Sequence, residues 1–233
     1  MAQSFFERPI LNSPYERPRL HHKLDDDGQP LDVPPVEGRR RSELITPVPK
    51  PRKRKASARQ GSFVFSDEQG LTTEDQEYNP GPIINEIRIH VEAWRSLPNP
   101  SDWGVTPATA RLLTHWRTYN FEGVRPFFCQ VEAIETLIWL TEVAGRQSRY
   151  RQIMEHVRAA NAASNPELLR LALKMATGAG KTTVMAMIIA WQTVNAVRSP
   201  TSNHFSRGFL VVTPGITIKD RRLARLIPTG ADV

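Results

Sequence analysis

Two short apolar runs near the C-terminal end of the chain enclose a longer stretch with the pattern of a helix. Residues 171–176 and 209–213 are mostly apolar, which predicts two strands that are buried on both faces of a parallel sheet. Residues 181 to about 197 have apolar side chains at Val184, Ile188 and Trp191 and almost no helix-breaking residue. Strand, helix and strand in this order predict an α/β fold.

Helical patterns also precede these runs. Residues 83–97 carry apolar side chains typical of a helix, and Thr106-Pro107 has the residue types of a helix start. Residues 148–163 predict a polar helix. Residues 124–140 predict an amphipathic helix, with Ile134, Leu137, Ile138 and Leu140 as its core positions. Four tryptophans in the upstream part of the chain are expected to pack in the interior: Trp94, Trp103, Trp116 and Trp139.

The first 82 residues differ in composition, which predicts an extended and largely irregular basic leader. Residues 1–60 hold 13 of the 31 Lys and Arg, 8 of the 24 acidic residues and 9 of the 19 prolines. Such a segment cannot bury enough apolar surface to fold by itself. The basic runs at 39–41 and 52–55 predict sequence-independent contact with DNA phosphates, or with a subunit, and a solvated linker is the structural alternative. The chain then divides into this leader (1–82), a helical region (83–123) and an α/β lobe (124–233).

The turn between the first apolar run and the helix carries the candidate chemistry. Residues 177–180, TGAG, must turn sharply, and glycines allow positive φ there and let a phosphate approach the backbone amides. The helix N-terminus that follows favours a polyphosphate. Lys181 would reach the β- and γ-phosphates, and the Thr182 hydroxyl would bind Mg²⁺. The common pattern G-x-x-x-x-G-K-[ST] asks for glycine where the chain has Met175, so a glycine-rich turn that binds nothing is the alternative.

The presence of Met175 where the common pattern has glycine points to a particular family of P-loop proteins. MATGAGKT, residues 175–182, resembles the Walker A motif of superfamily 2 helicases and translocases, whose loops read much like A-x-T-G-x-G-K-T. VRPFFCQVEAIETLIWL, residues 124–140, resembles the segment L-R-x-x-Q-x-E-A, in which a helicase glutamine reads adenine. Three upstream segments, FFERPILNSPYERPRLHHKLDDDGQP, VEGRRRSELITPVPKPRKRK and NEIRIHVEAWR, look like the opening of a bacterial type III restriction endonuclease R (Res) subunit. The similarity extends to about Asp220.

The resemblance implies a partial RecA-like P-loop NTPase lobe that binds ATP and Mg²⁺. Lys181 is then the catalytic residue and Thr182 the metal ligand. Gln130 is the residue that reads adenine, because an amide can donate to N7 and accept from N6; an exposed residue of an amphipathic helix is the alternative. The implied nucleotide-binding set is Gln130, Thr177, Gly178, Ala179, Gly180, Lys181, Thr182 and Thr183.

The second apolar run ends in Thr213, Pro214 and Gly215, which the resemblance assigns to contact with the nucleic-acid backbone. A hydroxyl and backbone N–H groups suit phosphate oxygens and position a duplex without reading its sequence. An ordinary strand-to-helix turn with proline at the helix start is the alternative. DNA, and a modification (methyltransferase) subunit, are the partners that the resemblance implies.

Family members also carry an acidic Mg²⁺ motif, a second motor lobe and a nuclease domain. After Lys181 the only acidic residues are Asp220 and Asp232, and neither is expected to end a buried strand. We therefore expect a truncated fragment that binds ATP poorly and does not hydrolyse it. The alternatives from other classes are a small P-loop phosphotransferase and a non-catalytic fragment that binds a partner.

The single cysteine, Cys129, leaves no disulfide framework and no cysteine-based metal cluster. Beside Phe128 it is expected to be a small core residue and not a nucleophile. The first residues of the chain lack the apolar core of a signal peptide, and the helix from residue 181 is too short an apolar run to span a bilayer. These features favour a cytoplasmic protein without membrane association.

Overall fold

The computed structural model describes residues 5, 7–25, 28–42, 81–123, 125–164 and 167–212. The chain divides into two compact units. One comprises Met1–Ser13, Arg17–Glu92 and Ser148–Arg170, and the other comprises Pro14–Glu16, Ala93–Gln147 and Leu171–Val233. Each unit is described by itself.

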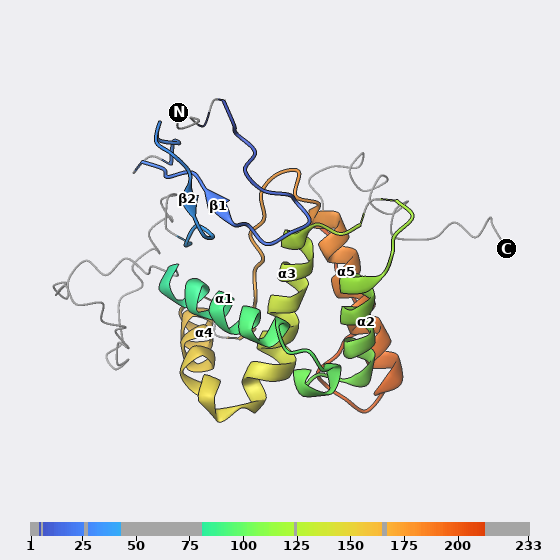
Figure 1. Ribbon diagram of the computed structural model, residues 1–233. Coiled ribbons are helices and arrows are strands. Elements are labelled where there is room, and N and C mark those ends of the chain that lie inside the picture. Colours follow the sequence, from blue (N-terminus) through green and yellow to red (C-terminus); the bar gives the residue numbers. More distant parts are fainter. Residues whose placement is uncertain are drawn as a thin grey trace, which may run out of the picture. The chain divides into compact units, whose positions relative to one another are not determined.

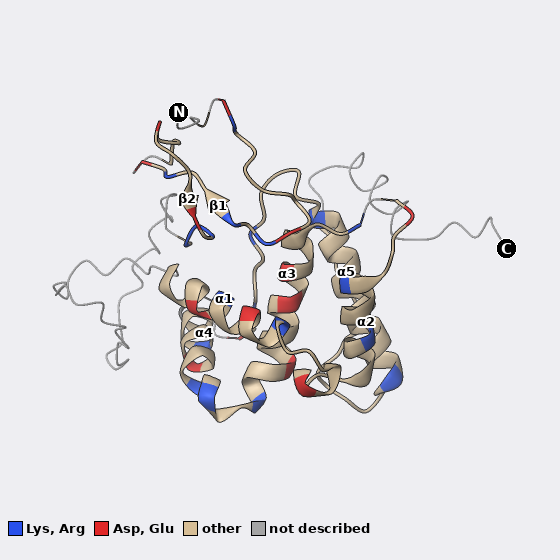
Figure 2. Ribbon diagram, viewed as in Figure 1, with Lys and Arg blue, Asp and Glu red and all other residues tan. Residues whose placement is uncertain are grey.

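The first unit contains the leader apart from Pro14–Glu16. Strands β1 (Leu20–His21) and β2 (Val36–Glu37) form an antiparallel pair of two residues each. The amide of Asn12 organises the segment before β1, since its Oδ1 accepts from the backbone N–H of Arg19 (2.8 Å) and of Leu20 (3.0 Å). The rest of the described leader has no further named strand or helix, and basic and acidic residues are interspersed along it (Figure 2).

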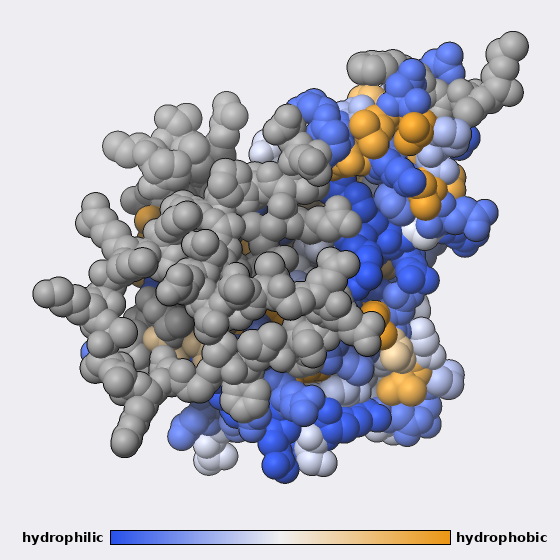
Figure 3. Space-filling model, turned by 90° about the vertical axis from the view of Figure 1, so that its left-hand side faces the viewer, coloured by the Kyte–Doolittle hydropathy of each residue, from blue (hydrophilic) through white to orange (hydrophobic). Residues whose placement is uncertain are grey.

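Two helices complete the described part of this unit. Helix α1 spans Gly81–Arg95, and its residues from Ala93 onward belong to the second unit. Helix α4 (Arg151–Ser164) follows the short helix η4 (Ser148–Tyr150). Asn85 of α1 connects the helix to the leader, because its side chain accepts from Ser42 N at 2.7 Å and donates to Ser42 O at 3.1 Å. On the face shown in Figure 3, apolar described residues form small areas between hydrophilic ones.

The second unit contains three longer helices and several short ones. These are η1 (Pro100–Trp103), α2 (Pro107–Thr118), α3 (Phe128–Ile138), η2 (Trp139–Val143), η3 (Ala144–Arg146) and α5 (Lys181–Arg198). Helices α3 and α5 begin at the same end, and α2 runs in the opposite direction (Figure 1). Thr106 caps α2 by accepting from Thr109 N at 3.1 Å, and Pro107 occupies the first helical position, as the sequence predicts.

The core of this unit is apolar apart from a few polar groups. The four core positions predicted in residues 124–140 are all buried, and so are Trp94, Trp103 and Trp139, whereas Trp116 is half-buried. The predicted helix 124–140 divides into α3 and the π-helical turn η2. The helical part of the predicted α/β architecture is thus confirmed.

The two predicted strands are wrong for the described residues. Residues 171–176 and 209–212 have no strand conformation, and the β1–β2 pair is the only sheet in the part of the chain that the structure describes. Leu210 and Val212 are 90% and 77% exposed. An apolar run becomes a buried parallel strand only where neighbouring strands satisfy its backbone and helices cover both faces. Among the described residues, no strand pairs with either of these two runs.

Candidate functional site

The glycine-rich turn has the backbone conformation that the sequence predicts. Gly178 and Gly180 have φ of 81° and 76°, which only glycine adopts without strain, and Ala179 N donates to Ala176 O at 3.3 Å. Gly180 is the N-cap of α5, and its carbonyl accepts from Thr183 N at 3.0 Å. The first N–H groups of a helix have no acceptor within it, and its dipole is positive at this end. The loop therefore presents donors suited to an anion.

Lys181 lies at this same end of α5. Its Nζ donates to Ala176 O at 2.9 Å, so the exposed side chain folds back along the loop. Thr177 and Thr183 are exposed and Thr182 is half-buried. The predicted phosphate-binding residues thus lie on one continuous loop and helix start.

Gln130 joins this loop from α3. Its side chain is buried (5% exposed); Nε2 donates to Ala179 O at 2.9 Å, and Oε1 accepts from Phe127 N at 3.0 Å. The interpretation of Gln130 as an exposed surface residue is therefore wrong. An amide nitrogen has two protons and its oxygen has two lone pairs, so each end retains capacity for one further hydrogen bond. Adenine recognition by Gln130 stays a prediction, and the structure brings the residue into contact with the loop.

The close approach of Gln130 also explains the need for glycine at position 180. A Cβ at Gly180 would lie 2.2 Å from Gln130 Nε2, whereas a Cβ at Gly178 would meet nothing within 4 Å. Both positions have positive φ, so alanine carries a similar backbone penalty at each. Comparing the alanine variants at the two positions therefore separates the effect of backbone strain from the effect of losing the Gln130 contact.

We expect Gly180→Ala to lower the free energy of unfolding by about 1 kcal/mol more than Gly178→Ala does, because it also displaces the Gln130 amide from its hydrogen bonds. Chemical denaturation followed by tryptophan fluorescence measures both values. In a Gln130→Ala background the difference should vanish, as a double-mutant cycle would show. Equal losses for the two glycine variants in the wild-type background would contradict a structural role for the Gln130 contact.

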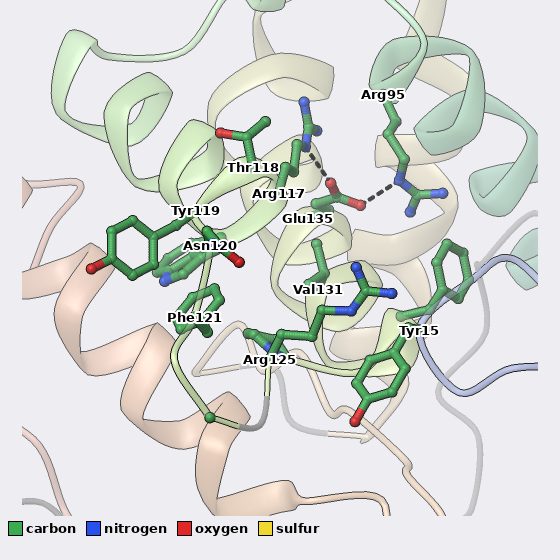
Figure 4. Close-up of a pocket in the computed structure, with 14 residues that line it drawn as sticks. Tyr15, Arg95, Arg117, Thr118, Tyr119, Asn120, Phe121, Arg125, Val131 and Glu135 are labelled. Carbon is green, nitrogen blue, oxygen red and sulfur yellow. Dashed lines mark hydrogen bonds and ion pairs between the residues drawn. The ribbon is translucent and has the colours of Figure 1, made fainter.

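Two buried carboxyl groups form polar clusters that sequence reasoning missed. The first is Glu135 of α3, which is 0% exposed and bridges two arginines (Figure 4). Arg95 Nε donates to its Oε2 at 2.5 Å, and Arg117 Nε donates to its Oε1 at 2.7 Å. The Arg117 guanidinium also lies 4.4 Å from the centre of the Trp103 ring. The cluster ties the ends of α1 and α2 to α3.

The second cluster surrounds Glu142 of η2 and joins α2 to α5. Its carboxyl group accepts from Thr106 N (2.8 Å), Thr109 Oγ1 (2.7 Å) and Trp191 Nε1 (2.7 Å). Asn195 of α5 completes it, since its Nδ2 donates to Thr109 Oγ1 at 2.9 Å and its Oδ1 accepts from Thr106 Oγ1. The helix that follows the glycine-rich loop is therefore held by a largely buried hydrogen-bond network. Acidic residues inside an apolar stretch were the sequence signal for both clusters.

Cys129 is exposed, so its prediction as a core residue is wrong. It is the second residue of α3 and lies one position before Gln130, which faces the interior. Partial desolvation of the sulfur raises the pKa of the Cys129 thiol. A raised pKa lowers the thiolate fraction, which does not favour nucleophilic chemistry.

Some predicted functional positions lie outside the described residues. They include Thr213, Pro214 and Gly215, the acidic residues Asp220 and Asp232, and the basic run at 52–55. The run at 39–41 is described, and it is mostly exposed. Contact of these positions with nucleic acid stays a prediction.

Comparison with known proteins gives one finding for the region that holds the loop. No curated protein and no solved structure matches the chain. Within the described part of the chain, no helix has the length and apolarity needed to cross a membrane. Residues 124–231, which include Gln130, the glycine-rich loop and α5, match the model of a family described as type III restriction enzyme, res subunit, and this part of the chain is therefore similar to helicase-like proteins with a P-loop.

Proposed function

We propose that residues 124–233 form the ATP- and Mg²⁺-binding part of a superfamily 2 helicase or translocase lobe of the type III restriction enzyme kind. The contact between Gln130 and Ala179 carries this proposal, because it brings a candidate adenine-reading amide to a loop that can hold phosphates. The two residues are 49 positions apart in sequence. In this proposal Lys181 binds the β- and γ-phosphates, and Thr182 binds Mg²⁺.

In this proposal the motor acts on DNA, and a modification subunit is a second partner. The proposal also places the protein in the cytoplasm. The family match over residues 124–231 supports DNA interaction in general. The basic leader supplies Lys and Arg for phosphate contacts that do not depend on sequence. Arg40 and Arg41 are exposed residues of this leader.

Lys181→Ala is expected to weaken binding of a non-hydrolysable ATP analogue by about tenfold or more, because a charge-assisted hydrogen bond to phosphate is lost. Isothermal titration calorimetry in the presence of Mg²⁺ measures the affinity. Arg198→Ala is the matched control, since it removes an exposed cation from the other end of α5. Equal affinities for wild type, Lys181→Ala and Arg198→Ala would refute the nucleotide site.

Thr182→Ala extends the same experiment to the metal. If Thr182 binds Mg²⁺, this variant should bind the analogue with the same affinity in the presence and absence of Mg²⁺, whereas wild type should bind more tightly with Mg²⁺. Thr183→Ala, at the adjacent exposed position, should retain the Mg²⁺ effect.

A further inference from the structure

A cavity of about 400 Å³ lies beside the Glu135 cluster in the second unit. The end of α1, the last turn of α2, the segment after it and one face of α3 line it. None of its lining residues belongs to the glycine-rich loop or is Gln130. Its volume is within the range of small-molecule sites, and it is sufficient for a single nucleotide unit.

The cavity has an excess of positive charge. Among the described residues, Arg95, Arg117 and Arg125 line it and Glu135 is the only acidic lining residue, while Glu132 pairs with Arg95 without lining the cavity. Glu135 pairs with the first two arginines. The Arg125 guanidinium lies 4.5 Å from the centre of the Tyr15 ring, and within the described part of the chain it has no carboxylate partner. A cation held on an aromatic ring without an acidic partner is suited to an anionic ligand.

Hydrogen-bond capacity is also unused beside this cavity. The Nη2 atoms of Arg95 and Arg117 are buried and have no hydrogen-bond partner among the described residues, although Arg95 Nη2 forms an ion pair with Glu132 Oε1 at 3.6 Å. Buried donors without a partner are rare, so the Nη2 atom of Arg117 calls for an explanation, and an acceptor on a bound ligand is one. Arg117 thus has a donor left over after Glu135 is bound, whereas the corresponding donor of Arg95 faces Glu132.

Aromatic rings form much of the remaining wall. Tyr119 and Phe121 lie on one side, with ring centres 5.0 Å apart, while Tyr15 and Arg125 lie on the other (Figure 4). Tyr119 is 56% exposed, so its ring is accessible to a ligand. Exposed aromatic rings next to arginine are the elements that stack nucleic-acid bases without strong sequence preference.

We propose that this cavity binds one nucleotide unit, with its base against the rings of Tyr119 and Phe121 and its phosphate on Arg125. The amide of Asn120, which also lines the cavity, offers a donor and an acceptor to the base edge. The cavity is distinct from the glycine-rich loop, because the two lie against different faces of α3. Successive residues of a helix point about 100° apart. Gln130 contacts the loop, whereas Val131 and Glu135 line the cavity.

The bound nucleotide unit is either a free nucleotide or one unit of a single-stranded nucleic acid. Two probes distinguish them, a nucleoside monophosphate and an eight-residue oligothymidylate. Trp116 lines the cavity and is half-buried, whereas the other four tryptophans are buried, so its fluorescence reports binding there. Trp116→Phe should remove the signal.

The experiment titrates each probe into wild type, Lys181→Ala, Arg125→Ala and Arg111→Ala. We expect Lys181→Ala to bind at least one probe within twofold of wild type and Arg125→Ala to bind it about tenfold more weakly, because the phosphate loses a charged partner. Arg111→Ala removes an exposed arginine of α2 that does not line the cavity, and it should bind as wild type does. Tyr119→Ala serves as a second cavity variant and should weaken binding through loss of stacking.

Binding of the oligothymidylate alone would assign the cavity to a strand, and binding of the monophosphate would assign it to a free nucleotide. The proposal is overturned if neither probe binds, if both cavity variants bind as wild type does, or if Lys181→Ala abolishes binding. The last result would place the probe at the phosphate loop and leave the proposed ATP site intact. Failure of Lys181→Ala to affect the ATP analogue would refute that site alone.

Discussion

Replacing Glu135 with alanine is expected to lower the free energy of unfolding by about 3–5 kcal/mol, because it leaves two largely buried arginines without their shared carboxylate. Arg95 and Arg117 have side chains that are only 20% and 15% exposed, so water cannot replace the lost partner without rearrangement. Urea denaturation measures the change. The fluorescence of Trp94 and Trp103, whose rings lie 5.4 and 4.4 Å from the Arg117 guanidinium, reports on this region.

Glu122→Ala is the matched control, since Glu122 is exposed and has no partner in the described structure. It should change stability by less than about 0.5 kcal/mol. A triple substitution that replaces Arg95, Glu135 and Arg117 with apolar residues should recover part of the loss, because no charge then stays buried. A loss below about 1 kcal/mol for Glu135→Ala would contradict the described ion-pair geometry.

The Glu142→Ala variant is expected to lose about 3 kcal/mol of stability, since three donors, two buried and one half-buried, lose the carboxylate that accepts from them, although Trp191 Nε1 retains Thr109 Oγ1 as an acceptor at 3.2 Å. These donors are Thr106 N, Thr109 Oγ1 and Trp191 Nε1. Thermal unfolding measures the loss, and Glu155→Ala, at an exposed position of α4, is the control. Glu142→Gln retains a carbonyl oxygen of nearly the same shape and should lose less.

The same variant tests whether the network positions α5. If the network holds the helix that carries Lys181, the folded Glu142→Ala protein should also bind the ATP analogue more weakly. An unchanged affinity, measured below the unfolding transition, would show that the network stabilises the unit without positioning the loop.

Local patterns predicted the helices well because they depend on neighbouring residues. The start of α2 at Thr106-Pro107 follows from a side-chain cap and a proline, both of which act within one turn. Helix α5 was predicted over residues 181 to about 197 and is observed as Lys181–Arg198. The positive φ of Gly178 and Gly180 follows from the sharp turn that precedes this helix.

Patterns that depend on partners distant in sequence were less informative. The runs 171–176 and 209–212 have the composition of buried strands, yet a strand forms only where other strands pair with it. The burial of Glu135 could not be predicted from α3 alone, because its two arginines come from α1 and from the end of α2. Similarly, the exposure of Cys129 depends on which face of α3 the rest of the unit covers.

The sequence by itself determined the glycine-rich loop and the helix that follows it, because backbone freedom and helix capping act locally. Only the tertiary structure decided that Gln130 is buried against Ala179 and that Glu142 joins α2 to α5. It also decided that three arginines and several aromatic rings surround one cavity. These contacts join residues that are far apart in sequence, and their energies depend on the packing that excludes water from them.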